Sequence, residues 1–488
     1  MTDRHHVVQE AVIGGKRVGA PESFEVLDPS TGQPCALVAR CGAEQVDQAV
    51  AAARETFETV WRHRSAADRA TACRRMAEVL LAHRDELAEL ETLDTGKPIS
   101  QAYVDVDAAA RYFDFYAGTV QALFGDTLLA QQDLIAYTLR EPHGVCGHII
   151  PWNYPLQVTA RTVAPALAAG NCCVLKPAED APLTALRIGE LALEAGFPPG
   201  ALNVVPGYGE EAGAALADHT GIDHLAFTGS REVGQLIMTK AAANIVPVTL
   251  ELGGKSPHLV FPDYDPAHDV PLMVRSIVEH AGQNCSAGSR VLVHESVHAG
   301  LVEELARVFG ALRIGRGGTD PDLGPLISAR QRDRVLAYLE LGRQAGRLVT
   351  GGAAPDDPEL AGGFFVQPTI FDDVPPDSRI AQEEVFGPVL SVTPFSTPHE
   401  AVALANGTPY GLSAGVWTRD LPLAHWLTRE LRASQVFVNN YSAAGGVELP
   451  FGGYKLSGFG REKGFEALRE YTRCKAVAIA VQPPPVAG

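Results

Sequence analysis

The sequence contains a cysteine in a loop of small and polar residues. The run from Gly282 to Arg290 reads Gly-Gln-Asn-Cys-Ser-Ala-Gly-Ser-Arg and places Cys285 between a predicted helix and a predicted strand. Thiolate nucleophiles occupy polar, partly exposed surroundings, whereas structural cysteines lie in continuous apolar sequence. Cys285 is therefore a candidate nucleophile, although the run alone is equally typical of a structural loop.

A carboxylate stands at the end of an apolar run farther upstream. Glu251 lies in Thr-Leu-Glu-Leu-Gly-Gly-Lys, residues 249–255. A carboxyl group held in a low-dielectric place has a raised pKa, which approaches the working range of a general base. Glu251 is therefore a candidate base. A salt bridge between Glu251 and Lys255 fits the spacing equally well.

A rigid turn with one amide side chain follows another apolar run. Pro-Trp-Asn-Tyr-Pro, residues 151–155, presents Asn153, whose amide could donate a hydrogen bond to a developing oxyanion. An asparagine that satisfies its own turn backbone is the alternative, and the pattern alone favours it.

Short apolar runs alternate with helical stretches before Lys255. Apolar residues at three- and four-residue spacing over 43–93 predict two helices. Apolar runs that end near Gly, Pro or Asn predict strands at 144–150, 173–175, 202–205, 224–227 and 246–250. Helices are expected between them at 183–195 and 210–217. The alternation is typical of βαβ units and a parallel, dinucleotide-binding sheet.

A second alternation follows Lys255 and predicts a second α/β lobe. Strands are expected at 257–260, 290–293, 389–395, 414–418 and 436–439, and helices at 270–280, 297–309, 329–345 and 398–406. Two extended segments, 131–140 and 471–481, fall outside both alternations. We interpret them as a small oligomerisation flap, which ends before the three prolines 483–485 because proline cannot continue a strand interior.

Composition excludes several classes of protein. A chain of 488 residues exceeds a single hydrophobic core, because cores stop growing near roughly 250–300 residues. The net charge of −18 argues against nucleic acid as a partner. No apolar stretch approaches the ~20 residues of a membrane span, and the first ten residues show no secretory signal, so we expect a cytoplasmic protein. Eight cysteines without paired spacing predict neither disulfides nor a metal site.

These motifs together resemble the aldehyde dehydrogenase superfamily over nearly the full length of the chain. The family's order and spacing are matched by 152–155, 175–179, 227–230, 251–255, the Cys285 loop, 383–388 and 450–455. The resemblance implies an aldehyde dehydrogenase-like fold with a NAD-binding domain over 1–123 and 144–253, a catalytic domain over 254–451, and oligomerisation segments over 124–143 and 452–488. It also implies a homodimer or homotetramer.

The resemblance assigns the three candidate catalytic residues. Cys285 would attack the aldehyde carbon, and Asn153 with the Cys285 N–H would hold the oxygen of the thiohemiacetal. Hydride transfer to the nicotinamide would leave a thioester, and Glu251 would activate the water that hydrolyses it. The nucleophile is needed because an aldehyde has no hydride-donating tetrahedral carbon until a group adds to it.

Cofactor residues are implied by the same resemblance. Glu179 would accept hydrogen bonds from the adenosine ribose and repel a 2′-phosphate of about −2 charge, so NAD is expected to bind better than NADP. The pyrophosphate would meet the backbone at Gly229 and Ser230, at the start of a helix. By spacing alone the glycines are not the standard dinucleotide fingerprint. The full predicted set is Trp152, Lys176, Glu179, Gly209, Gly213, Phe227, Gly229, Ser230, Val233, Leu252, Glu384 and Phe386.

The motifs also bear on two rival functions. The CoA-acylating branch of the family usually lacks the carboxylate that Glu251 supplies, so its presence favours hydrolysis. A non-catalytic relative that keeps the fold for binding or structure would tend to lose the nucleophile and the cofactor groups, all of which are present here.

The substrate is the least determined feature. We expect a substrate channel of Tyr154, Arg161, Asn284, Ser286, Gly445 and Phe451, with a roomy entrance at the small residues 442–446. Arg161 resembles the arginine with which succinic semialdehyde dehydrogenases bind a carboxylate, but Glu279 stands where those relatives have a second arginine. We therefore expect Arg161 to pair with Glu279 and the substrate to be an uncharged medium-chain or aromatic aldehyde, with a carboxylated semialdehyde as the alternative.

Overall fold

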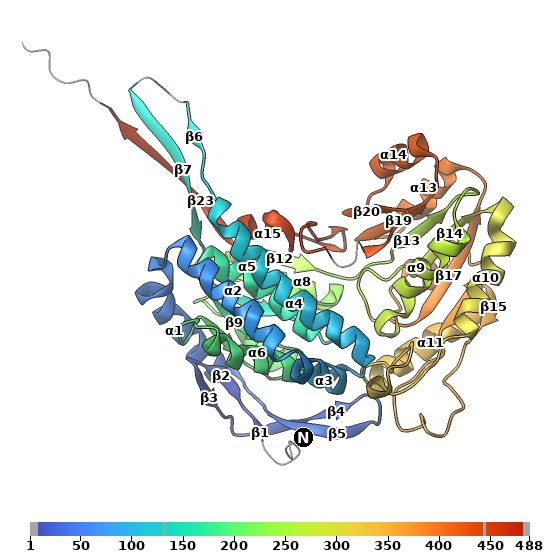
Figure 1. Cartoon of the computed structure of the whole chain (residues 1–488), viewed down its shortest axis with the longest axis horizontal. Coiled ribbons are helices and arrows are strands. Elements are labelled where there is room, and N and C mark those ends of the chain that lie inside the picture. The colour runs from blue at the N-terminus through green and yellow to red at the C-terminus, as the bar shows by residue number, and fades with distance from the viewer. Residues whose placement is uncertain (1–7, 130, 132, 443–445, 482–488) are drawn as a thin grey trace, which may run out of the picture.

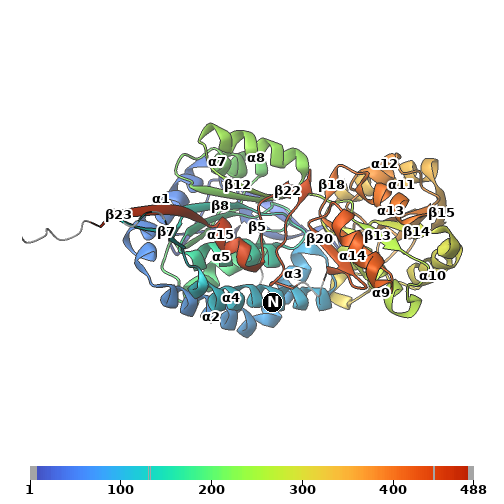
Figure 2. The same cartoon turned by 90° about the horizontal axis from the view of Figure 1, so that it is seen from above.

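The computed structural model describes residues 8–129, 131, 133–442 and 446–481. Two α/β lobes stand side by side, and a narrow β ribbon projects from the first lobe (Figures 1 and 2). The predicted fold class, two doubly wound lobes with a small β flap, is confirmed. None of the helices in the described ranges is long and apolar enough to cross a membrane.

An eight-stranded sheet forms the centre of the first lobe. Its five central strands run parallel, a single antiparallel strand is added at one edge, and an antiparallel hairpin is added at the other. Strands β8 and β9 are buried along their whole length, as expected for parallel strands that helices cover on both faces. The order is β22 (Gly458–Phe459), β12 (Val248–Glu251), β11 (His224–Thr228), β8 (Val145–Ile149), β9 (Cys172–Lys176), β10 (Leu202–Val204), β2 (Ala11–Ile13) and β3 (Lys16–Val18).

Helices cover both faces of this sheet (Figure 2). The prediction of two helices over 43–93 is wrong, because three form there. The helical structure is interrupted at Ser65, whose hydroxyl caps the next helix by accepting a hydrogen bond from the Asp68 N–H at 3.1 Å. A second interruption occurs at His83. The helices are α1 (Ala43–Thr59), α2 (Ala66–Ala82), α3 (Arg84–Thr95), α4 (Ile99–Thr119), α5 (Pro155–Ala169), α6 (Leu183–Glu194), α7 (Ala214–Ala217), α8 (Arg231–Ala243) and α15 (Gly464–Glu470).

The strand order of the first sheet reverses next to β8. The chain proceeds from β8 through β9 to β10 on one side, and β11 and β12 then lie on the other side. The loops that leave β8 and β11 therefore diverge, which creates the crevice where α/β sheets bind ligands. Asn153 follows β8, Ser230 follows β11, and Glu251 is the last residue of β12.

The second lobe has a seven-stranded sheet, parallel except at β15. Its order is β15 (Arg347–Thr350), β16 (Thr369–Asp372), β17 (Val389–Phe395), β14 (Arg290–His294), β13 (Pro257–Val260), β19 (Ser413–Trp417) and β20 (Gln435–Val438). The loop before β14 carries Cys285. The helices are α9 (Pro266–Val278), α10 (His298–Gly310), α11 (Ala329–Ala345), α12 (Arg379–Gln382), α13 (Pro398–Asn406) and α14 (Leu421–Glu430).

The projecting ribbon is a three-stranded antiparallel sheet of β6 (Thr127–Leu128), β7 (Leu134–Pro142) and β23 (Thr472–Ala480). The pairing of two segments far apart in the sequence agrees with the predicted flap. Within the predicted segment 452–488, residues before β23 pack on the lobes instead: β21 (Tyr454–Lys455) pairs with β18 (Tyr410–Gly411), and β22 joins the first sheet. A smaller sheet near the N-terminus contains β1 (Val8–Gln9), β4 (Ser23–Asp28) and β5 (Gln33–Ala39).

Candidate active site

A single cavity of about 1520 Å³ contains all three predicted catalytic residues, with walls from both lobes. Cys285, Glu251 and Asn153 line it together. The volume exceeds the range of about 300–1,000 Å³ that is usual for small-molecule pockets. The cavity therefore has room for a dinucleotide and a second molecule.

The Cys285 loop is held by hydrogen bonds on both sides of the cysteine. Gln283 is fully buried, and its Oε1 accepts from the Ile327 N–H at 2.9 Å. On the other side, the Tyr441 hydroxyl donates to the Ser286 carbonyl at 2.6 Å. Cys285 itself is partly exposed, so its thiol is positioned for attack while its loop is fixed. This favours the nucleophile over the structural-loop interpretation.

Charged groups of both signs surround the Cys285 thiol. Burial raises the pKa of Cys285 to about 11, the Arg161 guanidinium lowers it, and the carboxylates of Glu384 and Glu251 raise it further. The Lys463 ammonium also lowers this pKa. The thiol is consequently protonated at neutral pH in this state, and the two cations are the groups that favour the thiolate.

Glu251 is a buried carboxyl group that forms no ion pair. It is 1% exposed, and neither of its side-chain oxygens has a hydrogen-bond partner in the described structure. Burial, and next the charge of Glu462, raise the pKa of Glu251 well above its usual range. The alternative of a Glu251–Lys255 salt bridge is wrong, because the Lys255 Nζ is itself buried and unpartnered. These are the properties of a general base.

Asn153 reaches across to the cysteine loop. Its Nδ2 donates to the Gln283 carbonyl at 2.8 Å, so the amide does not satisfy its own turn. The backbone N–H of Cys285 makes no hydrogen bond within the described ranges. An amide side chain and a free N–H beside the same thiol can together hold an oxyanion.

The cofactor side of the cavity begins at the N-terminus of α8. Ser230 caps this helix, with its Oγ accepting from the Val233 N–H at 3.3 Å, and lines the cavity with Gly229. A side chain at Gly229 would meet the Phe227 ring, since a Cβ there would lie 2.5 Å from it. A helix N-terminus with a glycine before it suits the close approach of a pyrophosphate.

Two further groups fit a nucleotide. Lys176, which is 2% exposed, pairs with Glu179 through Nζ and Oε2 at 2.9 Å, so Glu179 is more than a surface charge. Glu384 accepts from the Gly254 N–H at 3.0 Å, and a Cβ on Gly253 would lie 2.1 Å from the Glu384 carboxylate. Glycine is therefore required at residue 253 for this close approach. These residues fit the predicted adenosine and nicotinamide ribose sites.

The structure brings most of the predicted cofactor residues to this cavity. Trp152 and Phe386 meet edge to face, with ring centroids 5.3 Å apart. Gly213 does not line the cavity; it lies in a π-helical turn over Gly209–Gly213, where an added Cβ would be 3.9 Å from the Lys176 side chain. The residues that do line it are Trp152, Lys176, Glu179, Gly209, Phe227, Gly229, Ser230, Val233, Leu252, Glu384 and Phe386.

Comparison with known proteins agrees with this geometry. The model of the aldehyde dehydrogenase family matches residues 17–477. The mitochondrial aldehyde dehydrogenase of Equus caballus is 44% identical over 466 residues, which cover 94% of this chain and 92% of the relative. The chain belongs to the aldehyde dehydrogenase family.

Solved structures of the family are similar over the whole fold. The NAD⁺ complex of an aldehyde dehydrogenase from Bacillus cereus has a TM-score of 0.95 and 41% identity, and covers 98% of both chains. A protein from Burkholderia cenocepacia assigned as an aldehyde dehydrogenase has a TM-score of 0.95 and 53% identity, and covers 97% of this chain and 100% of its own. The protein is therefore an NAD(P)-dependent aldehyde dehydrogenase, and NAD is its cofactor.

On the substrate side of this aldehyde dehydrogenase, the predicted pairing of Arg161 is wrong. Arg161 pairs with Glu462, with Nε 2.5 Å from Oε2, because Glu462 lies in the turn before α15, which packs on α5. Glu279 instead contacts the Tyr154 hydroxyl at 3.5 Å. Tyr154, Arg161, Asn284, Ser286 and Phe451 line the cavity as predicted, and Gly445 lies outside the described residues.

Two charged residues were not predicted: Lys463, which lines the cavity, and Glu462, which pairs with Arg161. They lie in Gly-Arg-Glu-Lys-Gly, residues 460–464, where neither an apolar run nor a spacing rule singles them out. Lys463 is 9% exposed, lines the cavity, and has its pKa lowered to about 8 by burial and by Arg161. At neutral pH its ammonium remains mostly protonated.

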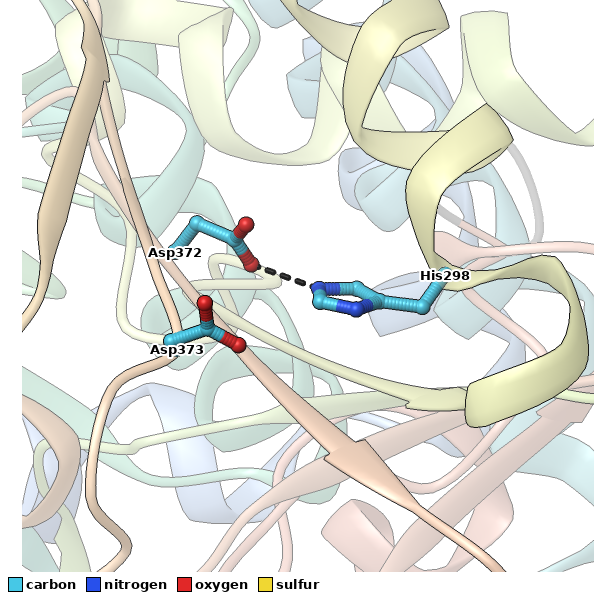
Figure 3. A group of neighbouring side chains, drawn as sticks. All are labelled: His298, Asp372 and Asp373. Carbon is cyan, nitrogen blue, oxygen red and sulfur yellow. Dashed lines mark hydrogen bonds and ion pairs between the residues drawn. The ribbon is translucent and has the colours of Figure 1, made fainter.

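One group of side chains outside the cavity has metal-ligating types. His298, Asp372 and Asp373 lie together at the edge of the second lobe (Figure 3). Asp372 is already bonded on both oxygens, to the His298 Nε2 at 2.7 Å and to the Arg347 guanidinium at 2.5 Å. We therefore interpret the group as an ion-pair network and assign it no metal.

Proposed function

We propose that the protein oxidises an aldehyde to the free carboxylic acid with NAD, through a thioester on Cys285 that is hydrolysed by water activated by Glu251. The observation that carries this proposal is the state of Glu251. It is a buried carboxyl group with a raised pKa and two unpartnered oxygens, in the same cavity as Cys285. Those properties supply a base for a water molecule, which a hydrolytic enzyme needs.

The chain's own residues divide the reaction into two steps. The Cys285 thiolate adds to the carbonyl carbon, while Asn153 and the Cys285 N–H receive the negative charge that develops on oxygen. Ser230 and Glu384, with the other residues on the cofactor side of the cavity, would hold NAD, which would supply the acceptor for the hydride of the tetrahedral adduct. Glu251 then takes a proton from water, the resulting hydroxide attacks the thioester carbon, and the Cys285 thiolate leaves with the carbon–sulfur electron pair.

The residues of the cavity distinguish hydrolytic oxidation from two rival functions. In a CoA-acylating enzyme the thioester would pass to a thiol, and a buried base beside the nucleophile would have no task. A non-catalytic relative would have no use for a nucleophile, a buried carboxyl group and an oxyanion-binding amide in one cavity. The site therefore supports hydrolytic catalysis over both.

The proposed substrate has an apolar body of medium length or an aromatic ring. Tyr154, Phe437, Tyr441 and Phe451 line the cavity near Cys285, and burying apolar surface against them stabilises such a substrate. The sequence predicted an uncharged aldehyde because Arg161 would be neutralised by Glu279. Arg161 is neutralised by Glu462 instead, and Lys463 adds a cation that the prediction did not include.

We also propose that the flap of β6, β7 and β23 joins copies of the chain in a homodimer or homotetramer. Its exposed faces carry apolar side chains, including Leu129, Ile135 and Ile479. The domain boundaries given by the sequence, and a cytoplasmic location, remain proposals alongside it.

The test uses the variant Glu251→Gln, which keeps the shape of the side chain and removes the base. The enzyme is mixed with an aldehyde and NAD, quenched in acid, and the Cys285 peptide is weighed by mass spectrometry. We expect an acyl adduct to accumulate in the variant after one equivalent of NADH forms, and the steady-state rate to fall by about 100-fold or more. Normal turnover by the variant would overturn the base assignment, and rescue of turnover by coenzyme A would favour the acylating branch.

A further inference from the structure

Lys463 occupies a backbone conformation that is almost restricted to glycine. Its φ is 61° and its ψ is 170°. The turn is fixed from both sides, because Phe451 and Glu462 exchange two backbone hydrogen bonds of 2.6 and 2.8 Å and the Gly464 N–H donates to the Val447 carbonyl at 2.7 Å. Strained residues of this kind persist where the surrounding structure holds them, and they cluster at functional sites.

The side chain of Lys463 extends into the catalytic cavity. It lines the same cavity as Cys285 and Arg161 and is 9% exposed. Its Nζ lies 5.1 Å from the centre of the Phe451 ring and 6.0 Å from that of Tyr112. Both contacts are with aromatic rings, which favour a cation but do not neutralise it.

Lys463 has no carboxylate partner within 4.0 Å among the described residues. Arg161, whose guanidinium also lies 5.1 Å from the centre of the Phe451 ring, forms the ion pair with the Glu462 carboxylate. Glu251, which lines the same cavity, forms no ion pair with Lys463 among the described residues, and burial raises the pKa of Glu251 well above its usual range. Of the two cationic side chains beside Phe451, Arg161 therefore has a carboxylate partner among the described residues, and Lys463 has none.

An unneutralised ammonium in a partly apolar cavity is costly unless a counter-charge arrives with the ligand. We propose that Lys463 is a specificity residue that binds a carboxylate at the far end of the aldehyde substrate, while the apolar middle of that substrate packs against Phe451. This inference rests on the proposed function, because it assumes that the aldehyde reacts at Cys285.

The same geometry also fits a second role for Lys463, stabilisation of the Cys285 thiolate. An experiment can distinguish this role from carboxylate binding. Lys463 is one of the cations that favour the Cys285 thiolate, although Arg161 has the larger effect on that pKa. A residue that only assisted the thiol would change the oxidation of every aldehyde by the same factor. A residue that binds a carboxylate changes the ratio between an anionic aldehyde and a neutral one of the same shape.

The experiment compares 6-oxohexanoate with 6-methylheptanal, which carry a carboxylate and an isopropyl group of similar size at the same distance from the aldehyde. We expect wild-type kcat/KM to favour the carboxylate by about tenfold or more, a charge-assisted contact of ordinary strength. Lys463→Met should lower that ratio by about tenfold, mainly through KM for the anion, and Lys463→Arg should keep most of it. Lys16→Met, a change of an exposed lysine on β3, is the matched control and should leave the ratio as it is.

Each result has a distinct meaning. A wild-type preference for 6-methylheptanal, or an equal loss of both activities in Lys463→Met, would overturn the carboxylate subsite. Shorter and longer ω-oxo acids, tested in the same way, find the chain length that the subsite prefers. A different outcome would contradict the proposed function itself. In that outcome the wild type makes no NADH with any of these aldehydes, and the Glu251→Gln variant accumulates no Cys285 adduct.

Discussion

Arg161, which lines the cavity that holds Cys285, forms a buried ion pair with Glu462, and its Nε lies 2.5 Å from Oε2 of the glutamate. The two side chains are 6% and 2% exposed. The pair joins α5 to the turn before α15 and sits beside both catalytic titrating groups. Glu462 raises the pKa of Glu251, whereas Arg161 lowers the pKa values of Glu251 and Cys285.

Removing the glutamate alone should destabilise the protein. Glu462→Gln leaves the Arg161 guanidinium buried without its counter-charge, and breaking a buried pair in this way costs about 3–5 kcal/mol. The double variant Arg161→Met with Glu462→Gln removes both charges and should recover most of that stability. Thermal unfolding of the three proteins measures the difference, and a Glu462→Gln variant as stable as the wild type would contradict the pairing.

The rate of the first step should rise with pH. The pKa of the Cys285 thiol is raised to about 11, and a thiol below its pKa gains about tenfold in thiolate for each pH unit. The raised pKa of Glu251 acts in the same direction on the second step, the hydrolysis of the thioester, because this carboxyl must lose its proton to serve as a base. We expect kcat/KM for a neutral aldehyde to climb between about pH 6 and pH 9. A flat profile would show that the thiolate is already formed at neutral pH.

Much of this site could be predicted from sequence because its parts follow strands. Asn153, Ser230 and Glu251 come at the carboxyl ends of three neighbouring parallel strands, and strand-ending motifs are visible as apolar runs followed by Gly, Pro or Asn. The topology then brings them to one edge of a sheet. The Cys285 loop was visible for a similar reason, since small polar residues interrupt an apolar pattern.

The rest of the site depends on packing between distant segments. Glu462 meets Arg161 only because α15 lies on α5, and no pattern within 460–464 records that contact. Glu279 was the predicted partner of Arg161 because it stands where related enzymes have a second arginine. The Glu279 carboxylate instead contacts the Tyr154 hydroxyl. The break between α2 and α3 was likewise hidden, because a continuous apolar stripe spans His83.

NAD should be preferred over NADP, and Glu179 should set the preference. A carboxylate at the adenosine ribose repels a 2′-phosphate, while the Lys176 ammonium that it pairs with would attract one. Glu179→Gln removes the repulsion and frees Lys176, so the kcat/KM ratio of NAD to NADP should fall by about tenfold, or roughly 1.4 kcal/mol. The same ratio in the wild type and the variant would refute the role of Glu179.

The flap should be required for assembly. Ile135 on β7 lies opposite Ile479 on β23, and the two are 54% and 48% exposed in the single chain. Ile135→Asp places a charge in that apolar surface and should shift the protein toward the monomer in sedimentation experiments. Leu81→Asp, a change of an exposed leucine on α2, is the control and should keep the wild-type assembly. An Ile135→Asp protein of wild-type size would place the interface elsewhere.

Glycine at residue 463 should stabilise the fold relative to alanine there. The φ of 61° and ψ of 170° are accessible to glycine, whereas a Cβ in this region costs about 1–3 kcal/mol. The greater freedom of glycine in the unfolded chain offsets about 0.4–1 kcal/mol of that difference.

Neither variant has the lysine side chain, so their comparison isolates the backbone from the loss of contacts with Phe451. We expect Lys463→Gly to unfold at a higher temperature than Lys463→Ala, and both to lose the preference for 6-oxohexanoate. A strained lysine retained where glycine would be more stable is the pattern that selection for function produces. An alanine variant as stable as the glycine variant would show that the backbone at residue 463 is not strained.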